Sequence, residues 1–313
     1  MLPAIRTRWL FLTSSNAWAS FRSRKLAVFA RGGKCGVTLG GFPVEVPKRL
    51  QDAVRMLTRD HYDQGEWRRE SAEIVREEAF TLFINGREWT TMIVTPTDLY
   101  ELVVGFLAAE HFIVAPQEIS ICQIRESEGQ VWVRIPGLRP ELLAQSGKRY
   151  ISNCCGRGRT GFYFAEDADI RPVPQGALRL KAHILGTLFN EFSAWTQMQH
   201  SGGLHAAGLW REGRLVAIRA DVGRHNALDK LYGYSLLHAL SLGEAAVVFS
   251  GRLSSEVIIK IARMGVPAVI SNAAPTTLGI ALAEALGITA VGFVRDEELS
   301  VYSHPERIDA PSL

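Results

Sequence analysis

The sequence predicts an α/β fold, with an α/β core over residues 176–313 and a smaller α+β region before it. Two observations lead to this class. In the last third of the chain, short apolar runs of strand length alternate with longer segments of helical periodicity. Further upstream, an Asn-Gly dipeptide separates two strand-like segments. Such β-α alternation implies a sheet with parallel neighbouring strands, flanked by helices.

We expect three parts along the chain. Residues 1–70 show little periodicity and several Gly and Pro breakers, and we interpret them as a poorly ordered leader or a mis-assigned start, with Met56 as an alternative start. The apolar run at Trp9–Leu12 is too short for a signal peptide, which needs about 7–15 apolar residues. Residues 71–175 are a hairpin and helix region with a cysteine loop, and residues 176–313 are the core with a ligand site.

The N-terminal region is predicted to begin with a β-hairpin. Its strands are Thr81–Ile84 and Arg87–Val94, and Asn85-Gly86 between them suits a type I′ turn. A further strand is expected over residues 130–135.

A helix is predicted directly after the hairpin. Thr95 can cap it, Pro96 fits the first helical position, and Asp98 completes a capping box. Apolar residues at helical spacing predict its buried face: Leu99, Leu102, Val103, Phe106 and Leu107.

The core is predicted to open with an amphipathic helix over residues 181–199. The strands predicted after it are 215–222, 245–249, 267–271 and 288–294. The helices predicted between them are 224–239, 254–264 and 276–286.

Composition and charge exclude several classes of protein. The chain is 47% hydrophobic and 21% charged, and no apolar run approaches the roughly 18 residues that span a bilayer. Residues 1–70 carry 13 Lys and Arg against 6 Asp and Glu, whereas residues 71–313 carry 22 against 26. The mildly acidic folded part argues against a nucleic-acid-binding body. We therefore expect neither a membrane nor a nucleic acid as partner.

Four cysteines are too few and too irregularly spaced for a disulfide framework. No C-x-x-C is present, so we expect no structural zinc. Reduced thiols, and hence a cytoplasmic protein, are the simplest interpretation.

The most informative segment is Ser152–Arg159, which holds Cys154 and Cys155 in a Gly/Arg-rich stretch without apolar periodicity. The alternative is an incidental pair of small residues, but buried structural cysteines occur in periodic apolar sequence. Arg157 and Arg159 favour a thiolate, so we predict a reactive thiol on a solvent-reachable loop.

Polar clusters follow the predicted core strands at their carboxyl ends, where open α/β sheets bind ligands. Arg224 and His225 follow the first strand, Arg252 follows the second, and Arg295 follows the last. Helix N-termini beside arginines bind phosphate well, so this edge predicts an anionic ligand such as a nucleotide pyrophosphate.

Two plainer interpretations stay open. Ser254 and Thr276 are expected as helix caps in any case. His205 is either a buried structural histidine or a group that lowers the pKa of a cysteine or accepts its proton.

These motifs resemble the formate dehydrogenase accessory sulfurtransferase family (FdhD) from about Glu78 through Ile308. Besides the hairpin and the cysteine loop, the motifs are S-G-G-L-H-A-A, D-V-G-R-H-N-A-L-D-K, S-G-R-L-S-S-E, A-P-T-T-L, G-F-V-R and Y-S-H-P-E-R-I. The resemblance implies a fold like that of cytidine deaminases, without deaminase chemistry.

The resemblance also implies a function. Such proteins take sulfur from a cysteine desulfurase as a cysteine persulfide. They transfer it to the molybdenum (or tungsten) bis(molybdopterin guanine dinucleotide) cofactor before that cofactor enters formate dehydrogenase. The expected partners are thus the desulfurase, formate dehydrogenase and a second copy in a homodimer.

Site residues carry over where the motifs match. Many members have C-G-x-C-G, whereas this chain has Cys155-Gly156-Arg157-Gly158 preceded by Cys154. Cys155 is then the expected persulfide carrier, and Cys154 a candidate for resolving or relaying it. The implied cofactor-binding stretch maps onto Phe293, Val294, Arg295, Asp296, Glu297 and Glu298. Members often have Gly and basic residues after the Arg; the acids here argue against phosphate contacts by residues 296–298.

Two other functions compete with this one. A zinc deaminase needs a Glu two residues after its His and a P-C-x-x-C, and neither accompanies His205. A non-enzymatic chaperone that binds the cofactor for formate dehydrogenase, without a sulfur relay, stays open because the cysteine loop is altered.

Overall fold

A computed structural model describes the backbone of residues 27–31, 34–39 and 42–45, and residues 53–139, 170–174, 176, 178–197, 202–296 and 298–309. The fold is mixed α/β, which confirms the predicted class. The predicted likeness to cytidine deaminases stays a prediction.

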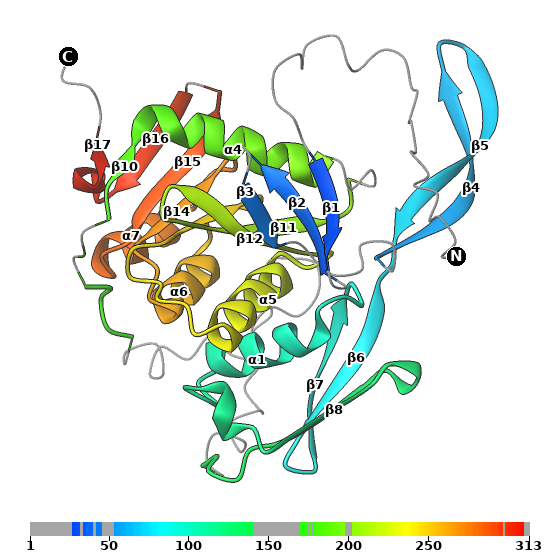
Figure 1. Cartoon of the computed structure of the whole chain (residues 1–313), viewed down its shortest axis with the longest axis horizontal. Helices are drawn as coiled ribbons and strands as arrows, with labels where there is room; N and C mark the ends of the chain where they lie inside the picture. Colours follow the sequence, from blue (N-terminus) through cyan, green and yellow to red (C-terminus); the bar gives the residue numbers. More distant parts are fainter. Residues whose placement is uncertain are drawn as a thin grey trace, which may run out of the picture.

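The core is built on one large mixed sheet, whose strand order is β1-β2-β3-β12-β11-β13-β14-β15-β16 (Figure 1). Strands β13, β14 and β15 are parallel, as predicted, while β11 is antiparallel to both β12 and β13 and β16 is antiparallel to β15. The strands are β1 Ala27–Arg31, β2 Lys34–Leu39, β3 Phe42–Glu45, β11 His205–Arg211, β12 Arg214–Asp221, β13 Ala246–Phe249, β14 Ala268–Ser271, β15 Thr289–Arg295 and β16 Glu298–Ser303.

Helices cover both faces of this sheet. Helix α4 lies on one face, and α5, α6 and α7 lie on the other (Figure 1). The side chains of β13 alternate accordingly: Val247 and Phe249 pack with α5 and α6, whereas Ala246 and Val248 pack with α4. The helices are α4 Ala182–Gln197, α5 Arg224–Leu237, α6 Ser255–Met264 and α7 Thr277–Ala285.

Short elements complete the described chain. Strands β10 Leu180–Lys181 and β17 Ile308–Asp309 pair in parallel. Single 3₁₀ turns lie at Pro116–Glu118, Glu126–Glu128 and Pro305–Arg307. No helix in the described residues has the length and apolarity needed to cross a membrane.

The N-terminal region is a four-stranded sheet of order β7-β6-β9-β8 with helix α1 on one face. Asn85 and Gly86 have φ of 50° and 83°, so the predicted hairpin turn is confirmed. The elements are β6 Glu78–Ile84, β7 Arg87–Val94, α1 Leu99–Ala109, β8 Ile121–Arg125 and β9 Gln130–Arg134.

Helix α1 joins the N-terminal region to the core by packing on α5. A Cβ atom on Gly105 would lie 1.8 Å from the carbonyl oxygen of Asp229, and one on Gly233 would lie 1.8 Å from that of Glu101. Only glycines permit this approach of two helix backbones. Because α1 is covered by the sheet on one side and α5 on the other, it is buried well beyond the predicted apolar stripe.

The predicted start of this helix is wrong. Helix α1 begins at Leu99, and Asp98 precedes it in the left-handed conformation with φ of 51° and no side-chain cap. The Thr95 hydroxyl instead accepts a hydrogen bond from the Val222 N–H at 3.1 Å. A tertiary contact with the core therefore replaces the local capping box.

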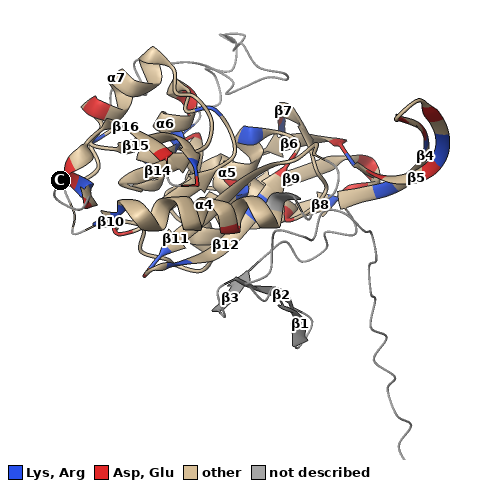
Figure 2. Ribbon diagram, turned by 90° about the horizontal axis from the view of Figure 1, so that it is seen from above, with Lys and Arg blue, Asp and Glu red and all other residues tan. Residues whose placement is uncertain are grey.

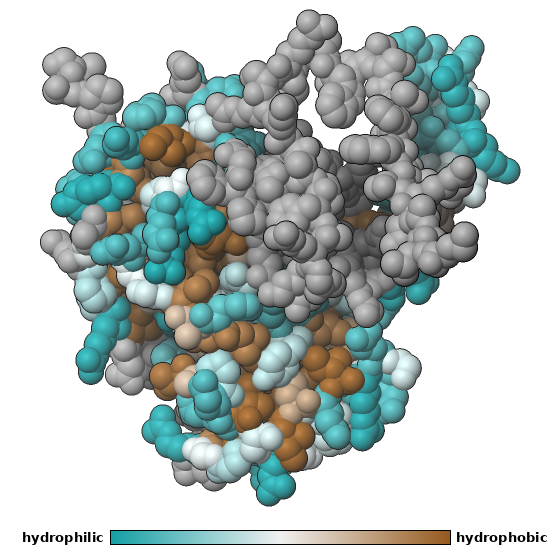
Figure 3. Space-filling model, viewed as in Figure 1, coloured by the Kyte–Doolittle hydropathy of each residue, from teal (hydrophilic) through white to brown (hydrophobic). Residues whose placement is uncertain are grey.

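A long hairpin precedes this region, formed by β4 Val54–Asp63 and β5 Glu66–Val75. It extends away from the body (Figure 2) and its surface is largely hydrophilic (Figure 3). The boundary predicted at residue 70 falls inside β5, so part of the predicted leader is an ordered hairpin. The two strands are joined by cross-strand ion pairs such as Arg59–Glu70 and Asp60–Arg69. Because they lack the alternation of apolar and polar residues that identifies a strand, they were not predicted from the sequence.

Candidate functional site

The carboxyl ends of β12, β13, β14 and β15 lie at one edge of the core sheet, because these four strands run in the same direction. Strand β11 runs the opposite way, so its first residue, His205, lies at this edge beside Asp221. Strand β11 was not predicted, and the placement of His205 next to the D-V-G-R-H cluster follows from it. His205, Arg224 and His225 lie together at this edge, close enough that, in addition to burial, the positive charge of Arg224 lowers the pKa of both histidines.

The His205 side chain contacts the loop that follows β13. Its Nδ1 lies 3.5 Å from the Ser250 hydroxyl, which in turn accepts the Ala206 N–H at 2.9 Å. Partial burial lowers the pKa of His205, and the nearby Arg224 guanidinium lowers it further, against a smaller opposing effect of Asp221. His205 is therefore neutral near pH 7 and able to accept a proton.

Arg224 and His225 begin helix α5 at the same edge. The Nε atom of Arg224 is buried and has no hydrogen-bond partner among the described residues. His225 Nε2 lies 3.0 Å from Glu256 Oε2. Burial lowers the pKa of His225, and this exceeds the opposite effect of the Glu256 carboxylate. Glu256 was not predicted, since nothing local in the sequence pairs it with α5.

The N-terminus of α6 has a second unpartnered group. Ser254 occupies the predicted N-cap position, but its hydroxyl makes no capping bond and is buried without a partner among the described residues. Thr276 caps α7 as predicted, accepting the Gly279 N–H at 3.1 Å. Ser254 Oγ and Arg224 Nε are thus donors at helix N-termini that an anionic ligand would satisfy.

The loops between these helices are tightly packed. The Ser271 hydroxyl donates to the Gly251 carbonyl at 2.9 Å and accepts the Ala273 N–H at 3.0 Å, linking the loops after β13 and β14. A Cβ atom on Gly251 would lie 2.7 Å from the Phe249 ring and 3.3 Å from the Arg224 side chain. The edge is therefore a preformed surface.

The remaining predicted residues are distributed along the same edge and beyond it. Arg252 is exposed just after β13. Phe293, Val294 and Arg295 end β15, with Val294 buried and the other two exposed, and Asp296 and Glu298 flank the turn into β16. Cys154, Cys155 and Glu297 lie outside the described residues.

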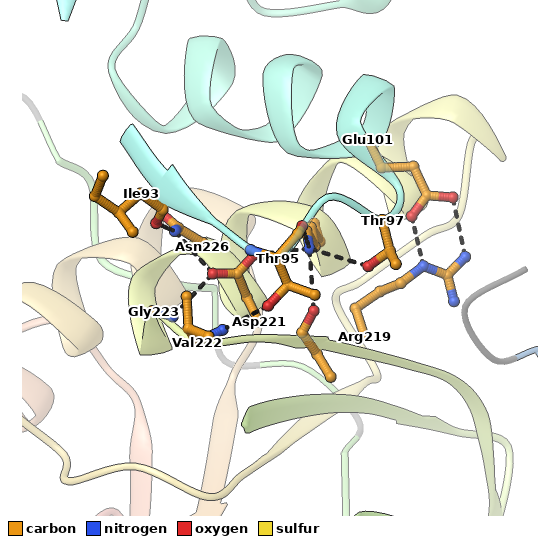
Figure 4. Close-up of polar contacts among 11 residues, drawn as sticks. Ile93, Thr95, Thr97, Glu101, Arg219, Asp221, Val222, Gly223 and Asn226 are labelled. Carbon is orange, nitrogen blue, oxygen red and sulfur yellow. Dashed lines mark hydrogen bonds and ion pairs between the residues drawn. The ribbon is translucent and has the colours of Figure 1, made fainter. Parts of the chain in front are cut away.

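Much of the D-V-G-R-H-N-A-L-D-K motif contacts the N-terminal region rather than the open edge (Figure 4). The fully buried Lys230 Nζ lies 2.7 Å from Asp221 Oδ2. Asp221 also accepts the N–H groups of Thr95 at 3.0 Å and Gly223 at 2.8 Å, and the Asn226 amide at 2.9 Å. Lys230 donates to the Thr95 carbonyl at 3.0 Å. These residues clamp the two regions together.

Further charged groups support this clamp. Arg219 bonds Glu101 of α1 through two contacts, at 2.5 and 3.0 Å, and its guanidinium lies 4.3 Å from the centre of the Tyr234 ring. Lys260 pairs with the buried Asp229. The D-V-G-R-H-N-A-L-D-K motif thus has two parts: Arg224 and His225 lie at the edge of the sheet, while its other charged residues stabilise the fold.

No group of three or more His, Cys, Asp or Glu side chains within the described ranges is arranged to hold a metal ion. The edge instead offers helix N-termini, arginines, hydroxyls and neutral histidines. Such a set binds phosphoryl groups and can move a proton.

Comparison with known proteins gives one consistent family. Residues 75–309 match the FdhD/NarQ family. The chain is 43% identical over 250 residues to the sulfur carrier protein FdhD of Bacillus subtilis, covering 79% of this chain and 94% of that protein. It is 41% identical over 250 residues to the sulfur carrier protein FdhD of Staphylococcus haemolyticus, covering 80% and 94%. A crystal structure of a protein from Desulfotalea psychrophila, described as a formate dehydrogenase accessory protein, superposes with a TM-score of 0.66 at 27% identity, covering 82% of this chain and all of that one.

Proposed function

Because this chain belongs to the FdhD/NarQ family, we propose that it is a sulfur carrier that supports formate dehydrogenase. The proposal depends on two findings that agree. The chain is about 40% identical to sulfur carrier proteins over most of its length, and one edge of its core sheet is suited to bind phosphoryl groups. We expect the protein to act in the cytoplasm as a homodimer. Its expected partners are a cysteine desulfurase and formate dehydrogenase.

In this proposal Cys155 is the nucleophile that accepts the sulfur. Its thiolate attacks the outer sulfur of a persulfide on the desulfurase, a new S–S bond forms, and the desulfurase thiolate leaves. This exchange needs no external oxidant or reductant. Arg157 and Arg159 near Cys155 in the sequence favour the thiolate. Cys154 is a candidate for relaying the sulfur.

The sulfur acceptor is the molybdenum (or tungsten) bis(molybdopterin guanine dinucleotide) cofactor, bound as substrate. The N-termini of α5 and α6, with Arg224 Nε and Ser254 Oγ unpartnered among the described residues, fit its pyrophosphates. Arg252 and Arg295 are exposed near the same edge and supply further positive charge. We assign to His205, whose pKa is lowered by burial, the role of accepting the proton of a cysteine thiol.

The test is maturation of a formate dehydrogenase in a host that lacks its own carrier. Cys155→Ala should abolish dehydrogenase activity while the purified variant still binds the cofactor. Cys122→Ala is the matched control, because burial raises the pKa of the Cys122 thiol to about 11 and keeps it protonated. Full maturation by a Cys154→Ala/Cys155→Ala double variant would overturn the relay and leave the chaperone function.

A further inference from the structure

The outer face of the N-terminal sheet, which points away from α1, carries aromatic side chains. On the inner face, Phe80, Leu82 and Val131 pack with α1, which lies between this sheet and α5 (Figure 1). Phe83 and Trp132 alternate with those residues along β6 and β9 and therefore lie on the outer face. A sheet with one face in water is ordinarily polar on that face, so partly buried aromatic rings there indicate a surface that a partner covers.

The centre of the outer face is a rigid stack of two rings. The parallel pairing of β6 and β9 sets Phe83 beside Trp132, and their ring centres lie 4.1 Å apart with planes 5° from parallel. The Trp132 indole N–H donates to Gln130 Oε1 at 2.9 Å, which fixes the ring further. Rigid aromatic rings lose little conformational entropy on binding and are enriched at the centres of protein interfaces.

A groove lies beside this stack, between the Asn85-Gly86 turn and β8. Its volume is about 470 Å³, and Trp132 and Ile121 form part of its walls. Ile121 is 48% exposed. Strand β8 pairs with β9 alone among the described strands, so its other side is open to a further strand. The groove can therefore take an apolar side chain of a partner whose main chain runs along β8.

The charge of the outer face favours an acidic occupant. Arg134 lines the groove, is exposed and has no ion pair with any described residue, and no described lining residue is acidic. Arg125 lies on the same face, with its guanidinium 5.9 Å from the centre of the Trp132 ring. Its ion pair with Glu128, at 3.3 Å, is exposed and therefore weak. An acidic segment with an apolar anchor fits both the groove and the two arginines.

The place of the groove in the chain indicates which partner this is. The chain reaches Cys155 19 residues after Pro136, which lines the groove. An extended chain of that length spans at most about 65 Å, so a sulfur donor docked in the groove is within reach of the thiol. The groove lies at the opposite end of β7 from Ile93, whose carbonyl accepts the Asn226 amide at 2.9 Å near the ligand edge (Figure 4). A donor in the groove thus leaves that edge open to the cofactor.

We propose that the outer face of the N-terminal sheet docks the cysteine desulfurase through an acidic segment that carries an apolar anchor. The residues that make the contact are Phe83, Ile121, Arg125, Trp132 and Arg134. The inference rests on the proposed function, because it takes a desulfurase as the sulfur donor. Docking holds the two proteins together and so raises the effective concentration of the donor persulfide near Cys155.

The experiment measures binding of the full chain to the immobilised, purified cysteine desulfurase of the same organism by biolayer interferometry. Arg134→Glu and Ile121→Asp should each raise the Kd about tenfold or more, because each places a carboxylate against an acidic occupant. Added salt should weaken binding of the wild type more than binding of Arg134→Gln. Arg171→Glu makes the same charge reversal at an exposed arginine outside this face and should leave the Kd unchanged. All variants should keep the thermal midpoint of the wild type.

Sulfur loading, followed by intact mass, separates docking from transfer. Arg134→Glu should raise the desulfurase concentration that gives half-maximal loading about tenfold and leave the rate at saturation unchanged. If the wild type gains sulfur but does not bind through this face, so that Arg134→Glu and Ile121→Asp match it, the inference is wrong and the proposed function stands. If the wild type binds the desulfurase as predicted and gains no sulfur, the relay fails and the docking stands. Variants that lose self-association or binding of formate dehydrogenase, with desulfurase binding intact, would also overturn the inference.

Discussion

Replacing Lys230 with methionine tests whether the buried clamp holds the two regions together. Lys230 Nζ lies 2.7 Å from Asp221 Oδ2, and both side chains are 0% exposed. Lys230→Met keeps the side-chain volume but leaves the Asp221 charge unpaired and removes donors to the carbonyls of Thr95, at 3.0 Å, and Ala220, at 3.1 Å. Removing one partner of a buried pair costs about 3–5 kcal/mol.

The assay is thermal and urea unfolding of the purified variant, followed by circular dichroism. For a chain of this size, each kcal/mol shifts the midpoint by about 2 °C, so a drop of about 6–10 °C is expected. Asp221→Asn combined with Lys230→Met removes both charges and should recover at least about 1 kcal/mol of the loss, because no buried charge is left unpaired.

A surface pair provides the matched control. Arg59→Ala breaks an ion pair on the hairpin whose side chains are 52% and 41% exposed, and should cost under about 1 kcal/mol. If Lys230→Met is no more costly than Arg59→Ala, the clamp does not stabilise the fold and the reasoning is refuted.

Three further predictions follow from the same contacts. Gly105→Ala should destabilise the protein by about 3 kcal/mol or more in urea unfolding, because the new Cβ atom would lie 1.8 Å from a backbone oxygen. Gly243→Ala is the control and should be neutral, because nothing lies within 4 Å of its Cβ position. Equal effects of the two substitutions would contradict the close packing of α1 on α5. The free energy of unfolding should fall as the pH drops below about 6.5, because burial lowers the pKa values of His205 and His225 and the unfolded state then binds more protons. The double variant His205→Asn/His225→Asn should lose this pH dependence. An unchanged pH dependence would show that other groups cause it. Arg224→Gln should weaken binding of guanosine diphosphate about tenfold in calorimetric titration without changing the unfolding midpoint; unchanged affinity would place the phosphates elsewhere.

The elements that could be predicted are those whose signals are local. Strands β13 to β15 are short apolar runs buried on both faces, and the helices between them carry their own periodicity. The Asn85-Gly86 turn depends only on its two residues and their φ angles. Arg224 and Arg295 were predicted at this edge because the carboxyl ends of parallel strands lie at the same edge of a sheet.

What could not be predicted depends on distant partners. The β4–β5 hairpin is stabilised by charged cross-strand pairs and lacks the apolar alternation that identifies strands. Thr95 resembles a helix cap locally, yet its backbone binds Asp221, which is 126 positions away. For the same reason the sequence does not reveal that Asp221 and Lys230, which belong to the D-V-G-R-H-N-A-L-D-K motif, bind the N-terminal region.

The most direct test of the central claim is intact-mass spectrometry after incubation with a cysteine desulfurase and cysteine, followed by non-reducing peptide mapping. The account predicts a gain of one sulfur atom on the peptide that contains Cys154 and Cys155, removable by reductant and absent from Cys155→Ala. The peptide with Cys122, whose pKa is raised by burial, should gain none. No gain with a demonstrably active desulfurase, or a gain confined to Cys122, would contradict the sulfur relay.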